Sequence, residues 1–430
     1  CIPVKALRGL ATFIFVGVLC FTSLQLYHAF KRVPLPPVDY LNHEPLLFGD
    51  WTLTYDDYQD QIYVYKAYYD TRNPGQAFVR VIGATSGADH GLICWLYGNG
   101  SFHYDFPRKR HLNFYQTKYA VVLVSCRWHQ DHAPERVFLL KDDDTVTTKT
   151  KGYAPVTTIP RQSAAPKYLI GACYQPLNNH YGDVYKTFLH LEVLRNLGVD
   201  RFIVYYSNTS VSKPLATLLQ HYVTLGLVIP VQWGLFVQPQ SPRDLISVYG
   251  QYAQLADCFY RFMYDFEYLF NLDMDEFPVP TGGHNWKPAL AHLFRRPYVS
   301  HYRLSNSYVL VSPSNNTRFA PADVFRNDVT VTQPCAGHYI SKYVAKPDRI
   351  VWAYVHEVLE SVPGHWIGHL SPKMATTYHI KRRNQTLFCS DDPSFNGGWL
   401  QMQTRIKTNF TELCASLFSN TTVCYEKFLL

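Results

Sequence analysis

The chain has 430 residues, of which 47% are hydrophobic and 17% charged, and its formal net charge is +7. A chain of this length exceeds what one hydrophobic core supports, so we expect two folded domains. The positive charge is spread along the sequence without a basic stripe, which argues against a nucleic-acid-binding protein. Aromatic residues make up 16% of the chain, and this share suits either sugar recognition or a tyrosine-rich β-sheet.

An apolar segment without Lys, Arg, Asp or Glu occupies residues 9–30. It is long enough to cross a bilayer, which takes about 20 residues, so we expect a transmembrane signal anchor there. A cleaved signal peptide would have a shorter apolar region and a small-residue cleavage site after it. Residues 1–8 are then a cytoplasmic tail, expected to be incomplete because the chain begins at Cys1, and the proline-containing residues 31–40 form a short stem.

The part of the chain after this segment has the features of a lumenal protein. Ten cysteines are present, and none of those beyond the anchor lies in a C-x-x-C pair, so disulfide bonds are favoured over a zinc site. Their connectivity is not readable, although Cys414 and Cys424 are close enough for a local loop. We therefore predict a single-pass type II membrane protein. N-x-S/T sequons, which mark glycosylation acceptors, occur at Asn99, Asn208, Asn315, Asn384, Asn409 and Asn420.

Residues 41–161 are predicted to form an all-β domain. Short β-branched and aromatic runs alternate there with Gly, Pro, Asp and Asn, and no helical period of useful length occurs. A small sandwich is the arrangement that this pattern favours. The runs lie at residues 61–70, 76–84, 92–98, 118–126 and 135–140.

Residues 162–430 are predicted to form an α/β domain, because strands and helices alternate at its start. We expect a mostly parallel, Rossmann-like sheet with helices on both faces and a ligand at the carboxyl ends of the strands. No G-x-G-x-x-G, P-loop or G-x-S-x-G motif is present, which argues against dinucleotide oxidoreductases, P-loop enzymes and α/β-hydrolases. The predicted strands are 168–173, 201–206, 227–233 and 266–272, and the predicted helices are 183–197, 214–225 and 245–264.

An acidic motif follows the last of these strands. Asp273 and Asp275 are two residues apart, so in an extended chain they point the same way, and Pro278 and Pro280 are expected to prevent a regular continuation. Two carboxylates at the end of a strand can hold Mg²⁺ or Mn²⁺ against a diphosphate. The motif therefore indicates a nucleotide-sugar transferase. The same spacing occurs in residues 142–144, within a polar segment that we interpret as a solvated turn.

Several segments resemble glycosyltransferase family 92. They are FIVYYSNTSVSKPLATLLQHYVTLGLV, YGQYAQLADCFYR, LFNLDMDEFPVP, ISKYVAKPDRIVWAYVHEV and TTYHIKRR, and the resemblance covers about residues 60 to 400 in order and spacing. It implies a Golgi type II enzyme with a GT-A-like catalytic domain that uses UDP-galactose and Mn²⁺ and forms β1,4 linkages on glycoprotein glycans. Acceptors in the family are core fucose in nematode members and terminal galactose in avian ones. We expect a terminal β-galactoside here.

The resemblance also implies roles for the acidic motif. Asp275 is expected to bind Mn²⁺, Asp273 to hold the ribose or a metal-bound water, and Glu276 to orient its neighbours. A later histidine often completes such a metal site. His356 matches the position after a hydrophobic run, and His379 is the alternative, although this chain reads His-Ile-Lys there where the family tends to read His-Tyr-Arg.

Five further residues are candidates for binding the donor nucleotide sugar. Tyr174 and Gln175 follow the first strand of the α/β domain, where they can meet the uracil or form a plain turn. Gln251 and Asp257 match the family on the helix before the acidic motif, and packing is their other interpretation. Lys342 is expected to neutralise phosphate unless it is an ordinary exposed charge.

Inverting transfer also needs a carboxylate base, and the sequence does not rank the candidates Glu276, Asp323, Asp328, Glu357 and Asp391. Two other functions stay open. One is an enzyme of the same fold with another UDP-sugar donor or a core-fucose acceptor, and the other is a catalytically inactive, membrane-anchored lectin.

Overall fold

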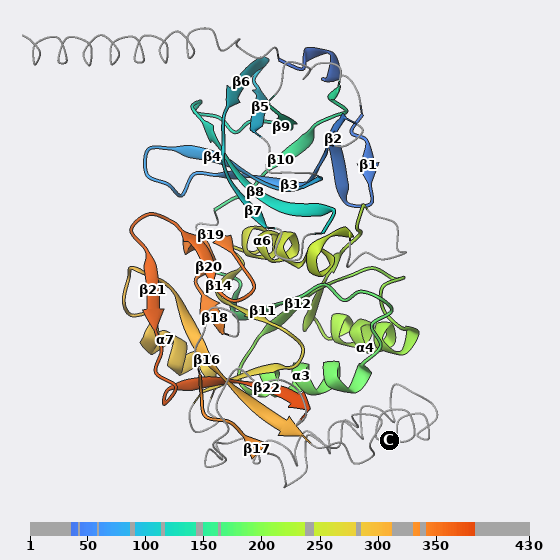
Figure 1. The fold of residues 1–430 in the computed structure, drawn as a ribbon. Helices are drawn as coiled ribbons and strands as arrows, with labels where there is room; N and C mark the ends of the chain where they lie inside the picture. Colours follow the sequence, from blue (N-terminus) through green and yellow to red (C-terminus); the bar gives the residue numbers. More distant parts are fainter. Residues whose placement is uncertain are drawn as a thin grey trace, which may run out of the picture.

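The computed structural model describes residues 36–41, 44–57, 60–86, 91–112, 117–142, 149–161, 165–236, 245–280, 285–311, 330–335 and 341–382. Within them the chain forms two ten-stranded sheets, one after the other along the sequence, and a two-stranded sheet (Figure 1). The predicted transmembrane segment at residues 9–30 lies outside this part of the chain. Among the described residues, no helix has the length and apolar character that crossing a membrane requires.

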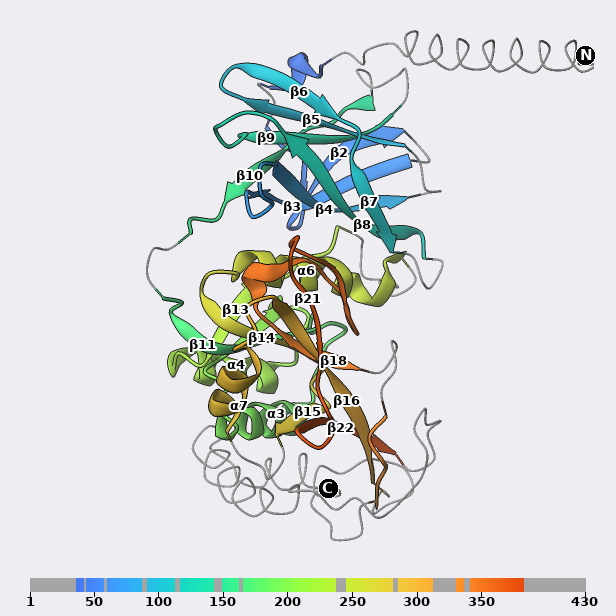
Figure 2. The ribbon, with the colours of Figure 1, turned by 90° about the vertical axis from the view of Figure 1, so that its left-hand side faces the viewer.

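The first ten-stranded sheet folds over on itself into the β-structure predicted for this part of the chain (Figure 2). β10 joins its two halves, because it pairs antiparallel with β9 and parallel with β3. The halves enclose a hydrophobic core, and the Cys94–Cys126 disulfide links β5 to β8 across it. After the 3₁₀ turn η1 (Val38–Tyr40), the strands are β1 (Leu47–Phe48), β2 (Trp51–Asp57), β3 (Asp60–Asp70), β4 (Ala77–Ser86), β5 (Leu92–Gly98), β6 (Ser101–Asp105), β7 (Arg108–Leu112), β8 (Tyr119–Trp128), β9 (Arg136–Lys141) and β10 (Ala154–Thr158).

The second ten-stranded sheet alternates with helices, as predicted. Its first half consists of β11 (Tyr168–Tyr174), α3 (Val184–Asn196), β12 (Arg201–Tyr206), α4 (Lys213–Thr224), β13 (Val228–Gln232), η2 (Ser247–Gly250), α6 (Gln251–Arg261) and β14 (Phe266–Leu272). The second half consists of β15 (Glu276–Pro280), α7 (Trp286–Leu293), β16 (Val299–Val311), β17 (Thr330–Val331), β18 (Lys342–Ala345), β21 (Trp366–His369) and β22 (Ala375–Arg382). The short η5 (Pro347–Arg349) and the β19 (Ile350–Ala353) and β20 (Val358–Ser361) hairpin lie between β18 and β21.

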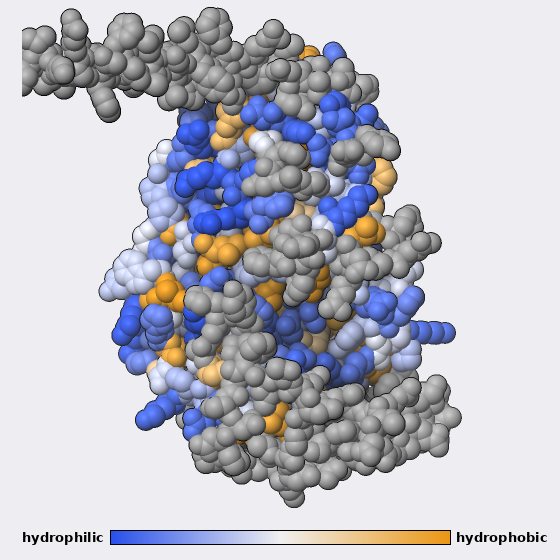
Figure 3. Space-filling model, in the orientation of Figure 1, coloured by the Kyte–Doolittle hydropathy of each residue, from blue (hydrophilic) through white to orange (hydrophobic). Residues whose placement is uncertain are grey.

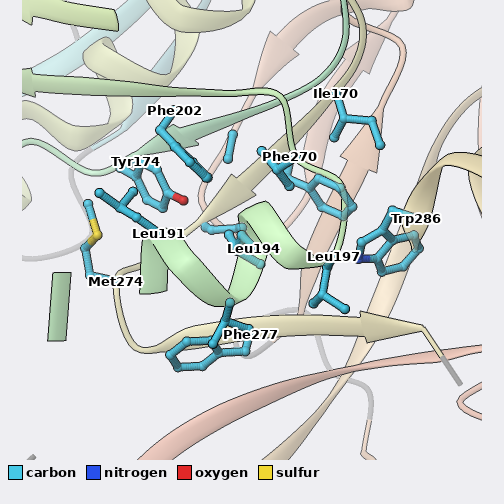
Figure 4. Close-up of a cluster of buried hydrophobic side chains, with 14 of the residues drawn as sticks. Ile170, Tyr174, Leu191, Leu194, Leu197, Phe202, Phe270, Met274, Phe277 and Trp286 are labelled. Atoms are coloured by element: carbon cyan, nitrogen blue, oxygen red, sulfur yellow. The ribbon is translucent and has the colours of Figure 1, made fainter. Parts of the chain in front are cut away.

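The strand order is β13-β12-β11-β14-β18-β16-β22-β15. β13, β12, β11 and β14 run parallel, whereas β18 is antiparallel to both β14 and β16. The predicted mostly parallel sheet is therefore mixed. Helices α3, α4 and α7 share a hydrophobic core with one face of the sheet, and α6 shares another with the opposite face. In the first of these cores, Leu191 and Leu194 of α3 pack near Phe202, Phe270 and Phe277 (Figure 4).

The helix predicted at residues 245–264 begins only at Gln251. Val248 and Tyr249 have φ values of 48° and 54°, and Gly250 has a φ of 76°. Left-handed residues cannot continue an α-helix, so the regular helix starts after them. Glycine is needed at position 250, because a Cβ atom there would also lie 3.0 Å from the Trp233 ring.

The expectation that Pro278 and Pro280 prevent a regular continuation is wrong. Both belong to β15, which pairs antiparallel with β22 at the edge of the second sheet. An edge strand has one row of backbone groups outside the ladder, so it tolerates proline, which lacks an N–H. The acidic motif therefore lies between two strands, β14 and β15.

The two sheets meet at helix α6, where one hydrophobic core contains residues of both. Asp257 of α6 is fully buried and accepts hydrogen bonds from Tyr68 of β3, from Tyr205 of β12 at 2.7 Å, and from Arg261 Nε at 2.9 Å. Burial, with the charge of Asp257 second, raises the pKa of both tyrosines well above the usual value, so they remain phenol donors. Asp257 thus joins the two sheets, and the structure does not support its predicted role in donor binding.

Hydrophilic side chains dominate the face in Figure 3, and hydrophobic ones gather in small patches, some of them near the boundary between the two sheets. At the same boundary, Arg72 donates hydrogen bonds to backbone carbonyls that follow β18 in the second domain, at 3.3 Å to Pro347 and 2.8 Å to Ile350. The boundary is therefore closed by apolar packing together with hydrogen bonds to charged groups.

Asp257→Ala is expected to lower the free energy of unfolding by about 3 kcal/mol or more, because Arg261 and two buried phenols lose their acceptor. Denaturant unfolding of the purified protein measures this. Lys287→Ala is the control, since Lys287 forms a partly exposed ion pair with Asp200 and its removal is expected to cost about 1 kcal/mol or less. Equal effects of the two variants would contradict a joining role for Asp257.

Candidate functional site

Residues Asp273–Glu276, which we call the acidic turn, lie at the carboxyl end of β14. The Glu276 N–H donates to the Asp273 carbonyl at 3.1 Å, and the Asp273 N–H donates to the Glu276 carboxylate at 3.1 Å. These bonds turn the chain instead of extending it, so the alternation predicted for Asp273 and Asp275 does not apply. The two aspartates have different partners. The turn does lie at the edge of the sheet where the sequence predicts a ligand.

Lys342 holds one side of the acidic turn. Its Nζ is 2.9 Å from Asp273 Oδ2 and 3.2 Å from Glu276 Oε2, and its side chain is fully buried. Burial lowers the pKa of this ammonium, but the charges of Asp273 and Glu276 outweigh burial and raise it above the usual value. Gln251 adds a hydrogen bond from Nε2 to Asp273 Oδ1 at 3.3 Å. Lys342, predicted to meet phosphate, therefore neutralises two carboxylates of the protein itself.

Asp275 points to another set of partners and is accessible, with 26% of its side chain exposed. Lys186 Nζ and His379 Nε2 each lie 3.5 Å from Asp275 Oδ2. Burial raises the pKa of the Asp275 carboxyl, but the proximity of His379 and the charge of Lys186 outweigh it and hold the pKa well below the usual range. Asp275 is thus ionised and faces two basic side chains.

His379 and His356, the two histidines considered for the metal site, differ in their contacts. His379 lies opposite Glu276 in the β15–β22 pair, and its Nδ1 is 3.4 Å from Glu276 Oε1. Its Nε2 is buried and has no hydrogen-bond partner among the described residues. His356 instead directs Nδ1 to the Ser341 carbonyl at 3.2 Å. Among the described residues, His379 therefore contacts the acidic turn within 3.5 Å, whereas His356 has a longer-range electrostatic interaction with Asp273.

The donor atoms at this turn fit a divalent cation that is shared with a ligand. Asp275 Oδ2 and His379 Nε2, which lie 3.5 Å apart, are the available pair. The fully buried Lys342 already neutralises Asp273 and Glu276, whereas the lysine beside Asp275, Lys186, is partly exposed. Among the described residues no three His, Cys, Asp or Glu side chains converge as a metal site. Mg²⁺ and similar hard cations are commonly held by one or two protein ligands together with substrate phosphates. Within the described ranges, the side chains at this turn do not by themselves complete a cation site.

Tyr174 and Gln175, predicted to meet the uracil, differ in exposure. Tyr174 is fully buried, and its ring lies 5.1 Å from that of His190 within the core under the sheet (Figure 4). This position does not support the predicted contact. Gln175 is half-buried at the end of β11, where the carboxyl ends of the parallel strands lie.

The candidate general bases differ in how far they are exposed and in their contacts. Glu276 is 2% exposed and its carboxylate already faces Lys342 and the Asp273 N–H. Glu357 is 32% exposed and lies 3.5 Å from Arg303. Asp323, Asp328 and Asp391 lie outside the described residues.

Of the predicted glycosylation sites, Asn99 and Asn208 are exposed in turns, while Asn315, Asn384, Asn409 and Asn420 lie outside the described residues.

Cysteine pairing is resolved in part. Besides Cys94–Cys126, Cys173 of β11 is bonded to Cys258 of α6, and Cys335 is also disulfide-bonded. Cys414 and Cys424 lie outside the described residues.

Lys186 is the residue at this site that the sequence analysis missed. It belongs to the first turn of α3, where its backbone N–H donates to the helix-capping Asp183 carboxylate at 2.9 Å. Helices that follow the strands of such sheets begin at the carboxyl edge, where ligands bind. A lysine at that position was therefore a detectable signal.

Three comparisons with known proteins complete this description. Residues 168–414 match the model of glycosyltransferase family 92. A search of curated proteins found no significant match.

Among solved structures, residues 1–349 of S. aureus TarS match at 13% identity and a TM-score of 0.26, covering 49% of this chain and 60% of that one. TarS in complex with UDP matches at 12% identity and a TM-score of 0.25, covering 50% and 60%. A UDP-glucose pyrophosphorylase from Acinetobacter baumanii matches at 12% identity and a TM-score of 0.25, covering 58% and 100%. The chain thus spans 60% of the length of the TarS structures.

Acid is expected to destabilise the protein through its buried histidines. Burial lowers the pKa of His190 to about 3 and those of His301 and His356 to about 4. Below the unfolded-state pKa of about 6.5, the unfolded chain takes up protons that the folded chain does not, so the free energy of unfolding falls as the pH falls towards 4. His190→Leu is expected to reduce the slope by roughly 1 kcal/mol per pH unit. Denaturant unfolding at several pH values measures this, and parallel curves for the two proteins would contradict it.

Proposed function

Because the chain belongs to glycosyltransferase family 92, we propose that it is an inverting galactosyltransferase with a GT-A-type catalytic domain. It transfers galactose from UDP-galactose to a glycoprotein glycan, with a terminal β-galactoside as acceptor and a β1,4 linkage. It is anchored in the Golgi membrane through residues 9–30, with the catalytic part in the lumen. Glycosyl transfer follows from the family, and the donor, acceptor, linkage and location are proposals.

The observation that carries the proposal is the Asp275–His379 pair at the carboxyl edge of the second sheet. An ionised carboxylate oxygen of Asp275 and the Nε2 atom of His379 lie 3.5 Å apart there. We propose that they hold Mn²⁺ together with the donor diphosphate. When bound, such a cation supplies positive charge against the charge that develops on the departing diphosphate.

Asp273 supports the donor from the other side of the turn. Its carboxylate is 20% exposed, and within the described part of the chain Lys342 contacts Oδ2 and Gln251 contacts Oδ1. Since each carboxylate oxygen has two acceptor positions, Asp273 can still accept a hydrogen bond from a ribose hydroxyl. Lys342 and Gln251 fix the direction of that bond.

Glu276 does not fit the role of general base. The base must reach the acceptor hydroxyl, and Glu276 is buried and engaged by Lys342. Within the described residues Glu357 fits better, because the loop that carries it lies at the end of β14, where Asn271 Nδ2 donates to the Val355 carbonyl at 2.6 Å. Glu276 is a positioning residue that sets the shape of the turn.

The first experiment measures UDP release by a secreted fragment starting near Asp39. It compares UDP-galactose with other UDP-sugars, with Mn²⁺ or EDTA, and with lactose-type galactosides as acceptors. UDP-galactose turnover that requires Mn²⁺ and rises with acceptor supports the proposal. If the protein turns over only another UDP-sugar, that sugar replaces UDP-galactose as the assigned donor. A folded protein that binds glycan but no UDP would be a lectin.

Asp275→Ala is expected to abolish transfer without loss of folding, because the residue is accessible and its removal leaves no buried charge unpaired. His379→Gln is expected to weaken Mn²⁺-dependent UDP binding by about tenfold or more, and His356→Gln, the matched control, is expected to leave it unchanged. Calorimetry with UDP and Mn²⁺ measures the binding, and circular dichroism checks the fold. An active Asp275→Ala enzyme, or a larger effect of His356→Gln than of His379→Gln, would refute the assigned metal site.

A further inference from the structure

The two lysines at the acidic turn differ in how firmly they are held. Lys342 is fully buried and faces Asp273 and Glu276, with the Val355 carbonyl as a third acceptor at 3.4 Å. Lys186 is 33% exposed, and among the described residues its ion-pair partner is Asp275, at 3.5 Å. Breaking a buried ion pair is costly, whereas a partly exposed pair is weak and readily exchanged. Lys342 is therefore a permanent counter-ion of the turn, and Lys186 can leave it.

We propose that Lys186 is a donor-binding residue that exchanges partners: it neutralises Asp275 in the donor-free protein and moves to the diphosphate when a divalent cation takes its place. The inference rests on the proposed function, because it assigns Lys186 to the same site. The occupant that it specifies is the diphosphate of a nucleotide sugar, whose oxygens suit an ammonium donor.

The geometry around Lys186 allows this movement. Its backbone is fixed in the first turn of α3 by the bond from its N–H to Asp183, so only the flexible side chain has to move. In the donor-free protein the ammonium faces the Asp275 carboxylate, with Nζ 3.5 Å from Oδ2. A cation at Asp275 Oδ2 repels this ammonium at close range. The diphosphate that arrives with the cation offers it a new anionic partner.

The exchange predicts effects of opposite sign for one substitution. Lys186→Met keeps the length of the side chain and removes its charge. Without the competing ammonium, Mn²⁺ alone is expected to bind the donor-free protein about three- to tenfold more tightly, and UDP at saturating Mn²⁺ is expected to bind about tenfold more weakly. A residue that only supports the fold would lower both affinities. Lys186→Arg keeps the charge and is expected to restore most of the UDP affinity.

The measurement uses the full chain purified in a mild detergent, with calorimetric titrations of Mn²⁺ alone and of UDP with Mn²⁺. Lys287→Met is the matched control, because Lys287 is also a partly exposed lysine paired with an aspartate, Asp200, at 2.9 Å. It is expected to change neither affinity. Circular dichroism confirms that each variant is folded.

Each outcome has a defined meaning. Opposite changes in the two affinities support the exchange. If wild-type protein binds UDP with Mn²⁺ and Lys186→Met changes neither affinity, or lowers both, the exchange is wrong and the proposed function stands. If UDP binds wild-type protein without any cation and Lys186→Met abolishes that binding, Lys186 meets the diphosphate but does not exchange with a cation, which also overturns the proposal. Folded wild-type protein that binds no UDP overturns the proposed function itself.

Discussion

A fully buried ammonium can persist in a protein only where carboxylates compensate its charge, and Lys342 imposes this constraint on the candidate site. Asp273 and Glu276 both face it, and they can do so only because the chain turns between them. The turn directs Asp275 away from Lys342, to the side where β22 brings His379. The accessible carboxylate therefore owes its position to the buried lysine. Removing that lysine would therefore affect the positions of Asp275 and His379 without removing a direct contact of either.

The regular elements of the second sheet could be predicted well from local sequence. The strands at residues 201–206 and 266–272 are confirmed with the predicted bounds, because a short apolar run between turn residues is a local signal. The predicted elements were wrong where contacts between distant parts of the chain, and not the local sequence, determine the backbone conformation. Left-handed φ values at Val248 and Tyr249 shorten a helix whose apolar period continues through them, and an edge position lets β15 contain two prolines.

The part of the candidate site that is contiguous in the sequence was predictable, and the residues that strand pairing brings to it were not. The acidic motif is contiguous and follows a recognisable strand, so the sequence located it. Lys342 and His379 reach it through sheet pairing, and a single sequence does not specify the register of strands so far apart in the chain. The sequence favoured His356, which follows a hydrophobic run, over His379, and only the pairing of β22 with β15 brings His379 to the acidic turn. Asp257 matched the family as well as Gln251 did, yet Asp257 bonds to Tyr205 in the core between the sheets, whereas Gln251 bonds to Asp273 in the acidic turn.

The different hydrogen-bond partners of Gln251 and Asp257 explain what the first sheet contributes to the site. Gln251 and Asp257 belong to one helix, α6. Gln251, its first residue, donates a hydrogen bond to Asp273, and Asp257, further along the helix, accepts one from Tyr68 of the first sheet. The hydrophobic core shared by the two sheets is rich in tyrosine and tryptophan. Within it the Tyr68 and Tyr260 rings stack with centroids 5.2 Å apart, and Tyr260 also donates to Asp70 at 3.4 Å. Tyrosines that are buried in this way cannot stack on sugars. The first sheet therefore supports the acidic turn through α6, and in this part of the chain the richness in tyrosine reflects the interface between the sheets rather than glycan recognition.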